Sequence, residues 1–273
     1  MDALVKIAKS HNLILIEDCA HALGGYFQGR RLGTFGDAAF FSFGRDKGVS
    51  SVWGGMAMMN AKCQMPNAKI KLQNIHTMLV YPSRFWILQQ LLHPVAFSFI
   101  LPLYQSGLGK ALLVALQKTK LLSIPVYPEG KRGDKPDMFP AKYPNALAKL
   151  LLLQLSKLDR FIGNRQEIVK LYAQTLKDVS GITVAPATAD SSWLRYPILV
   201  KNPQMLRLRA RRGGVYLGNW YHNVIDPSGV DFQAVLYVKA SCPHAEYAAQ
   251  HIVNLPTRIS HAQAQVVLKS VLS

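Results

Sequence analysis

Cysteine is scarce in this sequence, and a secretory leader is not evident. The 273 residues contain three cysteines, Cys19, Cys63 and Cys242, which are far apart and match no metal-binding spacing. An odd, scattered set excludes a disulfide framework, so we expect free thiols and a reducing, cytoplasmic compartment. The opening residues MDALVKIAKSHNLILIED carry early charges and no long apolar core, so we expect no signal peptide.

Acidic residues are also few. The sequence has 15 Asp and Glu against 32 Lys and Arg, a formal net charge of +17 that attracts phosphate, nucleic acid or anionic lipid. The basic residues are spread out, except in RLRARRGG at 207–214, and no zinc finger, RRM or helix-turn-helix pattern accompanies them. A solvated basic surface is therefore favoured, and we expect no nucleic-acid partner.

The first region of the chain has the pattern of an α/β sheet. With 49% hydrophobic residues the chain can bury a core, which excludes a disordered protein and predicts one or two domains. A helix is predicted at 2–10, and short apolar runs follow in LILIE at 13–17, AAFFSF and GMAMM. Apolar runs bounded by turn residues are typical of buried strands.

The last region has a helical beginning. From residue 144 the apolar residues recur every three or four positions through PNALAKLLLLQLSKLDRFIGNRQEIVKLYAQTLKDV, which predicts one long helix. A strand at 195–200, a basic helix near 203–212 and a closing helix from about 260 follow, with Ser260 as its N-cap.

The middle of the chain contains a long uncharged segment. From Phe85 to Gly109 there is no Lys, Arg, Asp or Glu. A transmembrane span is one interpretation, although polar residues and prolines inside the segment weaken it. A second is a hairpin at the membrane surface across 85–120, anchored by flanking cations. The third, and the favoured one, is a helical insertion that packs on the body of the protein or on a dimer mate. The weakening residues are Gln89, Gln90, His93, Pro94 and Pro102, and the cations are Arg84, Lys110, Lys118 and Lys120.

Four residues near the N-terminus form an ordered set. Asp18 ends an apolar strand, where open α/β sheets place ligand chemistry, and His21 follows three residues later. Ser42 stands between two phenylalanines, and Lys47 follows it by five residues, before SSVWGG. Taken singly, each has an ordinary explanation: a turn acid, a half-buried histidine, a small filler and a surface lysine. The complete pattern, EDCAHALGG followed by AAFFSFGRDKGVSSVWGG, is improbable by chance.

This pattern resembles the DegT/DnrJ/EryC1/StrS sugar aminotransferase family. The similarity continues in RYPILV, GVYLGNWY and SCPHAEYAAQHIVNLPT, and covers residues 1–62 and 138–273. The resemblance implies an α/β protein with part of a type I aminotransferase large domain, a mostly parallel sheet with flanking helices, and a small α+β C-terminal domain. The implied domains are 1–80 from the cofactor-binding domain, 81–137 as an apolar helical insertion, and 138–273 as the long helix and small domain.

The resemblance also implies a cofactor, pyridoxal 5′-phosphate, and a role for each of the four residues. Lys47 takes the place of the lysine that forms the Schiff base, and Asp18 that of the acid paired with the pyridine nitrogen. His21 takes a position that contacts the ring or its hydroxyl, and Ser42 one that contacts the phosphate. Some family members have histidine in place of this lysine and are dehydratases. Because this chain has Lys47, the resemblance favours an aminotransferase.

The implied reaction moves an amino group from an amino acid, usually glutamate, to a keto group of a nucleotide-linked sugar. Such sugars serve cell-surface polysaccharide and cell wall biogenesis. Family active sites lie between subunits, so the resemblance implies a homodimer.

The sequence departs from the family in two places. A long N-terminal part, with the helix end that cradles the cofactor phosphate and an aromatic residue that stacks on the ring, has no counterpart before Asp18. The resemblance thus predicts an N-terminally truncated member of an enzyme family, and it leaves open whether the truncation abolishes the activity of the isolated chain. Pro140 and Lys142 replace an Asn-x-Arg pattern that reaches the partner's cofactor. A noncatalytic remnant, acting as a binding or membrane-apposed subunit, is the alternative.

Overall fold

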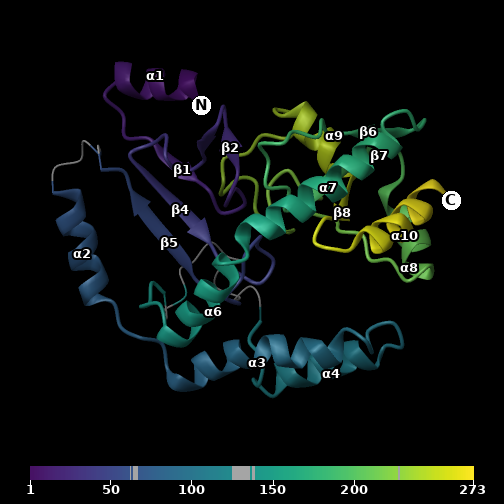
Figure 1. The fold of residues 1–273 in the computed structure, drawn as a ribbon, viewed down its shortest axis with the longest axis horizontal. Coiled ribbons are helices and arrows are strands. Elements are labelled where there is room, and N and C mark those ends of the chain that lie inside the picture. The colour runs from purple at the N-terminus through teal and green to yellow at the C-terminus, as the bar shows by residue number, and fades with distance from the viewer. Residues whose placement is uncertain (62, 64–66, 125–135, 137–138, 227) are drawn as a thin grey trace. The chain divides into compact units, whose positions relative to one another are not determined.

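The chain divides into two compact units. The computed structural model describes residues 1–273 except 62, 64–66, 125–135, 137–138 and 227. The first unit comprises the described residues up to Asp159 and the second Arg160–Ser273 (Figure 1). The domain boundaries expected near residues 80 and 137 stay a prediction. Part of the expected insertion, at 125–135 and 137, lies outside the described residues, as does residue 138 at the start of the expected third domain.

The sheet of the first unit has three short strands. After α1 (Asp2–Ser10), β1 (Ile16–Asp18) runs parallel to β4 (Ala38–Ser42), which pairs antiparallel with β5 (Gly55–Met59). The predicted strand at 13–17 is therefore shifted and shorter. The expectation of a mostly parallel sheet is wrong for the described residues, because the loop after Ser42 turns the chain straight back into β5 without a crossover helix.

Side chains alternate across β4 between two faces of this sheet. Ala39 and Phe41 are buried, whereas Phe40 on the other face is 42% exposed. The register pairs Glu17 with Ala39 and Asp18 with Phe40. Glu17 thus shares the buried face, and Asp18 shares the open face of β4, on which Ser42 also lies.

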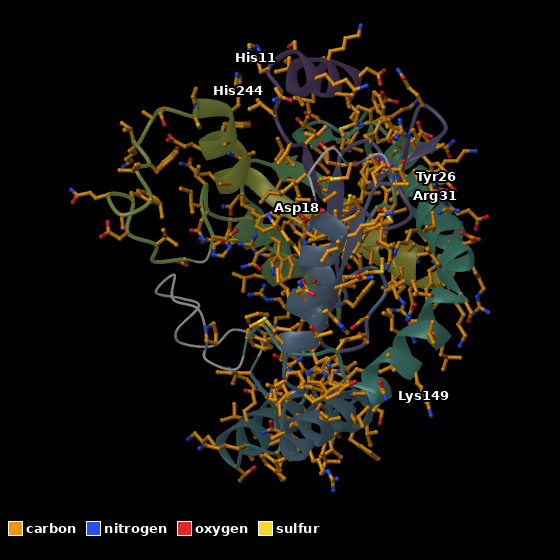
Figure 2. The ribbon with its side chains drawn as sticks, turned by 90° about the vertical axis from the view of Figure 1, so that its left-hand side faces the viewer. His11, Asp18, Tyr26, Arg31, Lys149 and His244 are labelled. Atoms are coloured by element: carbon orange, nitrogen blue, oxygen red, sulfur yellow. The ribbon has the colours of Figure 1, made fainter. Side chains whose placement is uncertain are left out.

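A hairpin of two short strands connects β1 to β4. Strand β2 (Tyr26–Phe27) pairs antiparallel with β3 (Arg30–Arg31). Tyr26 faces Arg31 across the hairpin, with the guanidinium carbon 5.0 Å from the ring centre (Figure 2). This cation–π pair closes the connection at its outer end.

The uncharged middle segment is helical. Helix α2 (Ala68–Met78) precedes α3 (Arg84–Ile100), which packs against α4 (Leu108–Lys118) (Figure 1). A Cβ at Gly109 would meet the Ile100 carbonyl oxygen at 2.2 Å, so glycine permits this close approach. Among the described residues no helix combines the length and apolar character that crossing a bilayer needs.

The predicted single long helix is wrong. The segment forms α6 (Asn145–Leu155) and α7 (Leu158–Leu176), with a break at Ser156 and Lys157. The Ser156 hydroxyl donates to the Leu153 carbonyl at 2.9 Å, and the Lys157 amide bonds the carbonyl three residues back. The bond of the Lys157 amide to a carbonyl three residues back, in place of the four of an α-helix, marks the end of α6.

The second unit has an antiparallel sheet, in the order β6 (Ile182–Val184), β7 (Arg195–Val200) and β8 (Ile252–Pro256). Its further helices are α8 (Pro203–Arg212), α9 (Pro243–His251) and α10 (His261–Leu272). The strand expected at 195–200 and the basic helix at 203–212 are confirmed. Ser260 forms a capping box with Gln263, so the predicted N-cap is confirmed as well.

Helix and sheet residues of the second unit share one core. The rings of Tyr172 on α7 and Tyr196 on β7 stack at 6.1 Å, and both are fully buried. Their hydroxyls donate to backbone carbonyls, and burial raises the pKa of each. The core continues in the buried residues Ile168, Val169, Leu176, Ile198, Val253, Leu255, Val267 and Leu268.

Candidate active site

The carboxyl ends of β1 and β4 lie side by side in the first unit. The parallel pairing continues one residue past β1, where the Cys19 amide donates to the Phe40 carbonyl at 2.9 Å. Asp18, at the end of β1, is exposed, and its Oδ1 accepts a hydrogen bond from the Ala20 amide at 2.9 Å (Figure 2). Because parallel strands end at the same edge, the loops after Asp18 and Ser42 begin next to each other.

These two loops meet through a lysine and a histidine. Lys47 Nζ lies 2.5 Å from His21 Nε2, a hydrogen bond between residues from the two different loops. The Lys47 amide donates to the Gly44 carbonyl at 3.1 Å, which curls the loop after β4. Ser42 Oγ accepts from the Gly44 amide at 3.4 Å, which leaves its own hydrogen to donate. The structure thus brings Lys47 against His21 and places Ser42 at the base of the same loop.

Sequence reasoning missed the structural role of Glu17. Its buried carboxylate accepts three backbone N–H groups: Oε1 bonds Phe35 at 2.7 Å and Gly36 at 2.8 Å, and Oε2 bonds Gly33 at 2.8 Å. These bonds hold the loop between β3 and β4, residues 32–37, over the buried face of the sheet. This segment is called the crossover loop below. A Cβ at Gly33 would meet the Phe41 ring at 2.6 Å. Strand alternation could have placed Glu17 on the inner face, opposite to Asp18.

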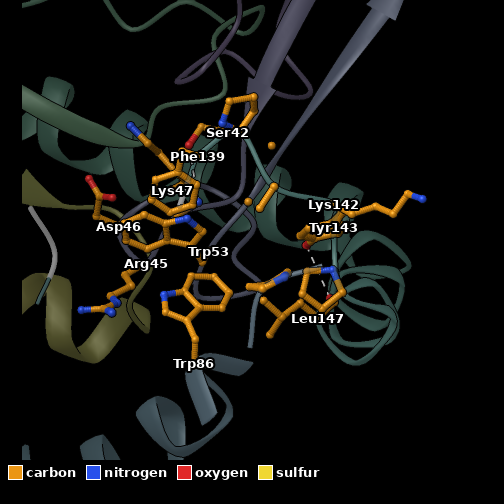
Figure 3. Close-up of a pocket in the computed structure, with 17 residues that line it drawn as sticks. Ser42, Arg45, Asp46, Lys47, Trp53, Trp86, Phe139, Lys142, Tyr143 and Leu147 are labelled. Carbon is orange, nitrogen blue, oxygen red and sulfur yellow. Dashed lines mark hydrogen bonds between the residues drawn. The ribbon is translucent and has the colours of Figure 1, made fainter. Parts of the chain in front are cut away.

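A pocket of about 490 Å³ opens beside Lys47. Figure 3 shows Ser42 and Lys47 among its lining residues, whereas Asp18 and His21 are not among those lining it. Trp53 and Phe139 form an aromatic wall, their rings stacked at 5.4 Å, and Trp86 lies edge-on to Trp53 at 6.0 Å. The pocket therefore combines an amine and a hydroxyl with a large flat apolar surface.

Arg45 fixes the lysine loop to the helical hairpin. Its guanidinium donates to the Ser123 carbonyl at 2.9 Å and to Gln90 Oε1 at 3.2 Å. Gln90 is fully buried and also donates to the Trp86 carbonyl at 3.3 Å. Arg45, two residues before Lys47, thus attaches the lysine loop to α3 by hydrogen bonds.

Lys142 and Tyr143 border the pocket on its far side. Lys142 extends away from the other lining residues, and its ammonium lies 5.4 Å from the Tyr81 ring centre (Figure 3). Burial raises the pKa of Tyr143, which contacts the Ser51 hydroxyl. Pro140 also lines the pocket.

The cysteine next to Asp18 is held in its neutral form. Burial, with the carboxylates of Glu17 and Asp18, raises the pKa of the Cys19 thiol to about 11. All three cysteines are free thiols, as expected, and the described residues contain no group of His, Cys, Asp or Glu arranged to hold a metal. The reactive side chains at the strand ends are therefore the amine of Lys47, the imidazole of His21 and the carboxylate of Asp18.

The fold is that of an α/β protein, and it covers part of known aminotransferase structures. The chain matches the model of the DegT/DnrJ/EryC1/StrS aminotransferase family over residues 1–120 and 139–272. It belongs to this family. The match is wider than the motifs alone indicated, because it includes α2, α3 and α4.

Individual relatives are similar to this chain over different extents. The GDP-perosamine synthase of Escherichia coli O157:H7 is 47% identical over 62 residues, 23% of this chain and 17% of that protein. The erythromycin biosynthesis sensory transduction protein EryC1 of Saccharopolyspora erythraea is 26% identical over 94% of this chain and 56% of its own.

A solved structure with bound cofactor has a similar fold. The E. coli GDP-4-keto-6-deoxy-D-mannose-3-dehydratase with bound hydrated PLP superimposes with a TM-score of 0.65 and 16% identity, over 100% of this chain and 63% of that one. That dehydratase binds PLP. The chain spans less than two thirds of each of these relatives, 17% to 63% of their lengths.

Proposed function

We propose that the chain carries the lysine-bearing part of a PLP-dependent sugar aminotransferase. The amino donor is an amino acid, glutamate in this proposal, and the acceptor is a keto group of a nucleotide-linked sugar destined for cell-surface polysaccharide. The observation that carries the proposal is the contact of Lys47 Nζ with His21 Nε2 at the ends of two adjacent parallel strands. The name of the E. coli relative, GDP-perosamine synthase, supports a sugar nucleotide as acceptor.

The residues at the strand ends fit PLP. Lys47 and Ser42 line one pocket, so Lys47 can bind the aldehyde of the cofactor and Ser42 can bind its phosphate. Asp18 lies on the same face of the sheet as Ser42, and its exposed carboxylate can pair with a pyridine nitrogen. When bound, PLP acts as an electron sink for the substrate carbon that loses its proton.

The chain's own side chains supply positioning and proton transfer. His21 Nε2 orients Lys47 Nζ, which in this proposal would bind the cofactor aldehyde and move the proton between the substrate carbon and the aldehyde carbon of the cofactor. Ser42, whose oxygen already accepts from Gly44, donates its hydrogen to the phosphate. Arg45 keeps the loop on α3 and so fixes the path of the backbone at Lys47.

The side chain at position 47 separates two reaction classes. The dehydratase has a similar fold, so the fold does not distinguish dehydration from amino transfer. A lysine amine would react reversibly with the cofactor aldehyde, whereas the imidazole of the histidine expected in dehydratases would not. Lys47 therefore favours amino transfer, with the complete protein acting as a homodimer.

Reductive trapping tests the proposal. The chain is incubated with increasing PLP, reduced with borohydride and digested, and each lysine peptide is quantified by mass spectrometry. We expect Lys47 to be modified at lower PLP than any other lysine, and Lys47→Arg to lose that high-affinity label. Lys149→Arg, which removes an exposed lysine of α6 (Figure 2), is the matched control and retains it. Equal labelling of Lys47 and Lys149 at every PLP concentration would refute the assignment.

A turnover assay addresses the isolated chain. Amino transfer from glutamate to a keto sugar nucleotide is followed by mass spectrometry of the product. Selective trapping at Lys47 without any transfer would support the noncatalytic alternative for this chain, while it would keep the assignment of the lysine.

A further inference from the structure

Helix α3 has an apolar stripe that faces away from the protein. Phe85, Leu88, Val95 and Phe99 recur at a spacing that places them on one helical face, and they are 54%, 50%, 56% and 63% exposed. Trp86, Gln90 and Ile100, on the opposite side of the helix, are buried. The helix is therefore apolar on two sides, of which only one packs against its own unit.

The stripe continues around the turn into α4. Leu101, Leu103 and Leu108 are 62%, 42% and 63% exposed. The hairpin patch is defined here by the exposed apolar side chains of this segment. They are Phe85, Leu88, Val95, Phe99, Leu101, Leu103 and Leu108. Large exposed apolar patches of this kind mark surfaces that bind a partner.

The charge around the hairpin patch has one sign. The sequence has no Asp or Glu from residue 47 to residue 128, a stretch that includes both helices of the hairpin. The cations that flank the hairpin are all exposed: Arg84, Lys110, Lys118 and Lys120. Apolar side chains flanked by lysine and arginine, in a stretch of sequence without acids, are complementary to an anionic lipid surface.

The geometry excludes a spanning arrangement of α3. The helix has 17 residues, which at about 1.5 Å per residue falls short of the ~30 Å hydrocarbon core. Its inner face is also occupied, because fully buried Gln90 accepts a hydrogen bond from Arg45. The hairpin can therefore lie on a bilayer but not cross one.

The charge also argues against a second copy as the occupant. A two-fold symmetric contact brings the same surface of both chains together. Here it would bring the flanking cations of one copy close to those of the other, with no acidic side chain in the segment to pair with them. An anionic bilayer has no such repulsion.

We propose that the α3–α4 hairpin docks the protein on an anionic membrane surface. The hairpin patch enters the boundary between headgroups and acyl chains, and the four flanking cations contact the anionic headgroups. The proposal does not depend on PLP binding by Lys47, because the hairpin patch lies on the side of α3 opposite to Trp86 and Gln90, which border the pocket and the lysine loop. An enzyme held in this way would act where lipid-linked substrates are available.

Vesicle sedimentation with the full chain tests the apolar half of the proposal. Binding is compared between phosphatidylcholine vesicles that contain phosphatidylglycerol and vesicles of phosphatidylcholine alone. We expect the double variant Phe85→Ser with Phe99→Ser to partition at least about tenfold more weakly onto the anionic vesicles. Met205→Ser with Leu208→Ser is the matched control, because these α8 side chains are 61% and 54% exposed. We expect this control to bind like the wild type.

A charge series tests the electrostatic half. Replacing Lys110, Lys118 and Lys120 by Gln is expected to weaken binding to the anionic vesicles by about a hundredfold, at roughly 1 kcal/mol per cation. The same change at Lys201, Arg211 and Arg212, which are exposed in the second unit, alters the net charge equally and is the control. We expect it to have a much smaller effect. Circular dichroism melts verify that every variant is folded.

Three results would overturn the proposal. The first is equal vesicle binding by the hairpin variants and their controls, and the second is no vesicle binding by the wild type. The third comes from sedimentation equilibrium without lipid: if the wild type is a dimer that does not bind anionic vesicles and the Phe85 and Phe99 variant is a monomer, the patch binds a second copy.

Discussion

Replacing Glu17 by Gln should open the crossover loop while leaving most of the protein folded. The carboxylate is 7% exposed and is the common acceptor for the amides of Gly33, Phe35 and Gly36. Glutamine has nearly the same shape but only one acceptor oxygen. Its amide nitrogen must therefore point at one or two of these N–H groups, donor against donor.

The magnitude follows from the three bonds. In the best orientation the remaining oxygen keeps the bonds to Phe35 and Gly36 and the amide faces Gly33. That arrangement loses one charge-assisted bond, worth about 1.5–3 kcal/mol, and weakens the other two by removing the charge. We therefore expect the loop to lose about 3 kcal/mol, which corresponds to a roughly hundredfold faster local opening.

Hydrogen exchange at the three amides measures this loss directly. In Glu17→Gln the amides of Gly33, Phe35 and Gly36 should exchange about a hundredfold faster than in the wild type. Glu167→Gln makes the same chemical change at an exposed position of α7 and should alter none of them. If exchange in the Glu17 variant stays within about threefold of the wild type, these hydrogen bonds do not hold the loop.

Two further substitutions probe the surroundings of the pocket and the hairpin. Gly54 has φ +117°, and an added Cβ would meet the Tyr143 ring at 2.2 Å, so Gly54→Ala should cost about 1–3 kcal/mol more in urea unfolding than Gly29→Ala, where φ is +75° and nothing lies within 4 Å. Equal costs would contradict this packing argument. Burial, with the charge of Arg45, lowers the pKa of His93 from 6.5 to about 4. The unfolded chain thus binds more protons in this pH window, and stability should fall as the pH drops from 6.5 towards 4. We expect His93→Gln to flatten this dependence of the melting temperature, and the exposed control His76→Gln to retain it; identical curves for wild type and His93→Gln would count against the burial of this ring.

The sequence predicted the local elements better than their assembly. The N-cap at Ser260 and the strand at 195–200 depend on neighbouring residues, and both are confirmed. The break at Ser156 was missed because the apolar period continues through it, and the tighter turn at Lys157 leaves no trace in that period. The parallel sheet was inferred from the family's large domain, and the direction of β5 depends on the loop between Ser42 and Gly55.

For the candidate site, too, the sequence predicted the local features and missed those that depend on tertiary packing. The motif brought together Lys47 and His21, which touch, but gave no reason to expect Glu17 as the anchor of the crossover loop. The aromatic wall was also missed, because Trp53 and Phe139 are far apart in the sequence and stack only after the chain folds. Long-range contacts of this kind follow from tertiary packing and not from a local pattern.

The contact between Lys47 and His21 depends on elements that the motif does not contain. The end of β1 positions His21. On the buried face of the sheet, Glu17 of the same strand holds the crossover loop by hydrogen bonds. Lys47 is placed by a loop that Arg45 ties to Gln90 on α3, within the uncharged segment. Since α3 also carries the hairpin patch, the same helix supports the lysine loop on its inner side and offers an apolar surface on its outer side. A lysine loop supported in this way would keep its geometry only if α3 is folded, so substitutions on the inner face of α3 should disturb PLP trapping, and substitutions on its outer face should not.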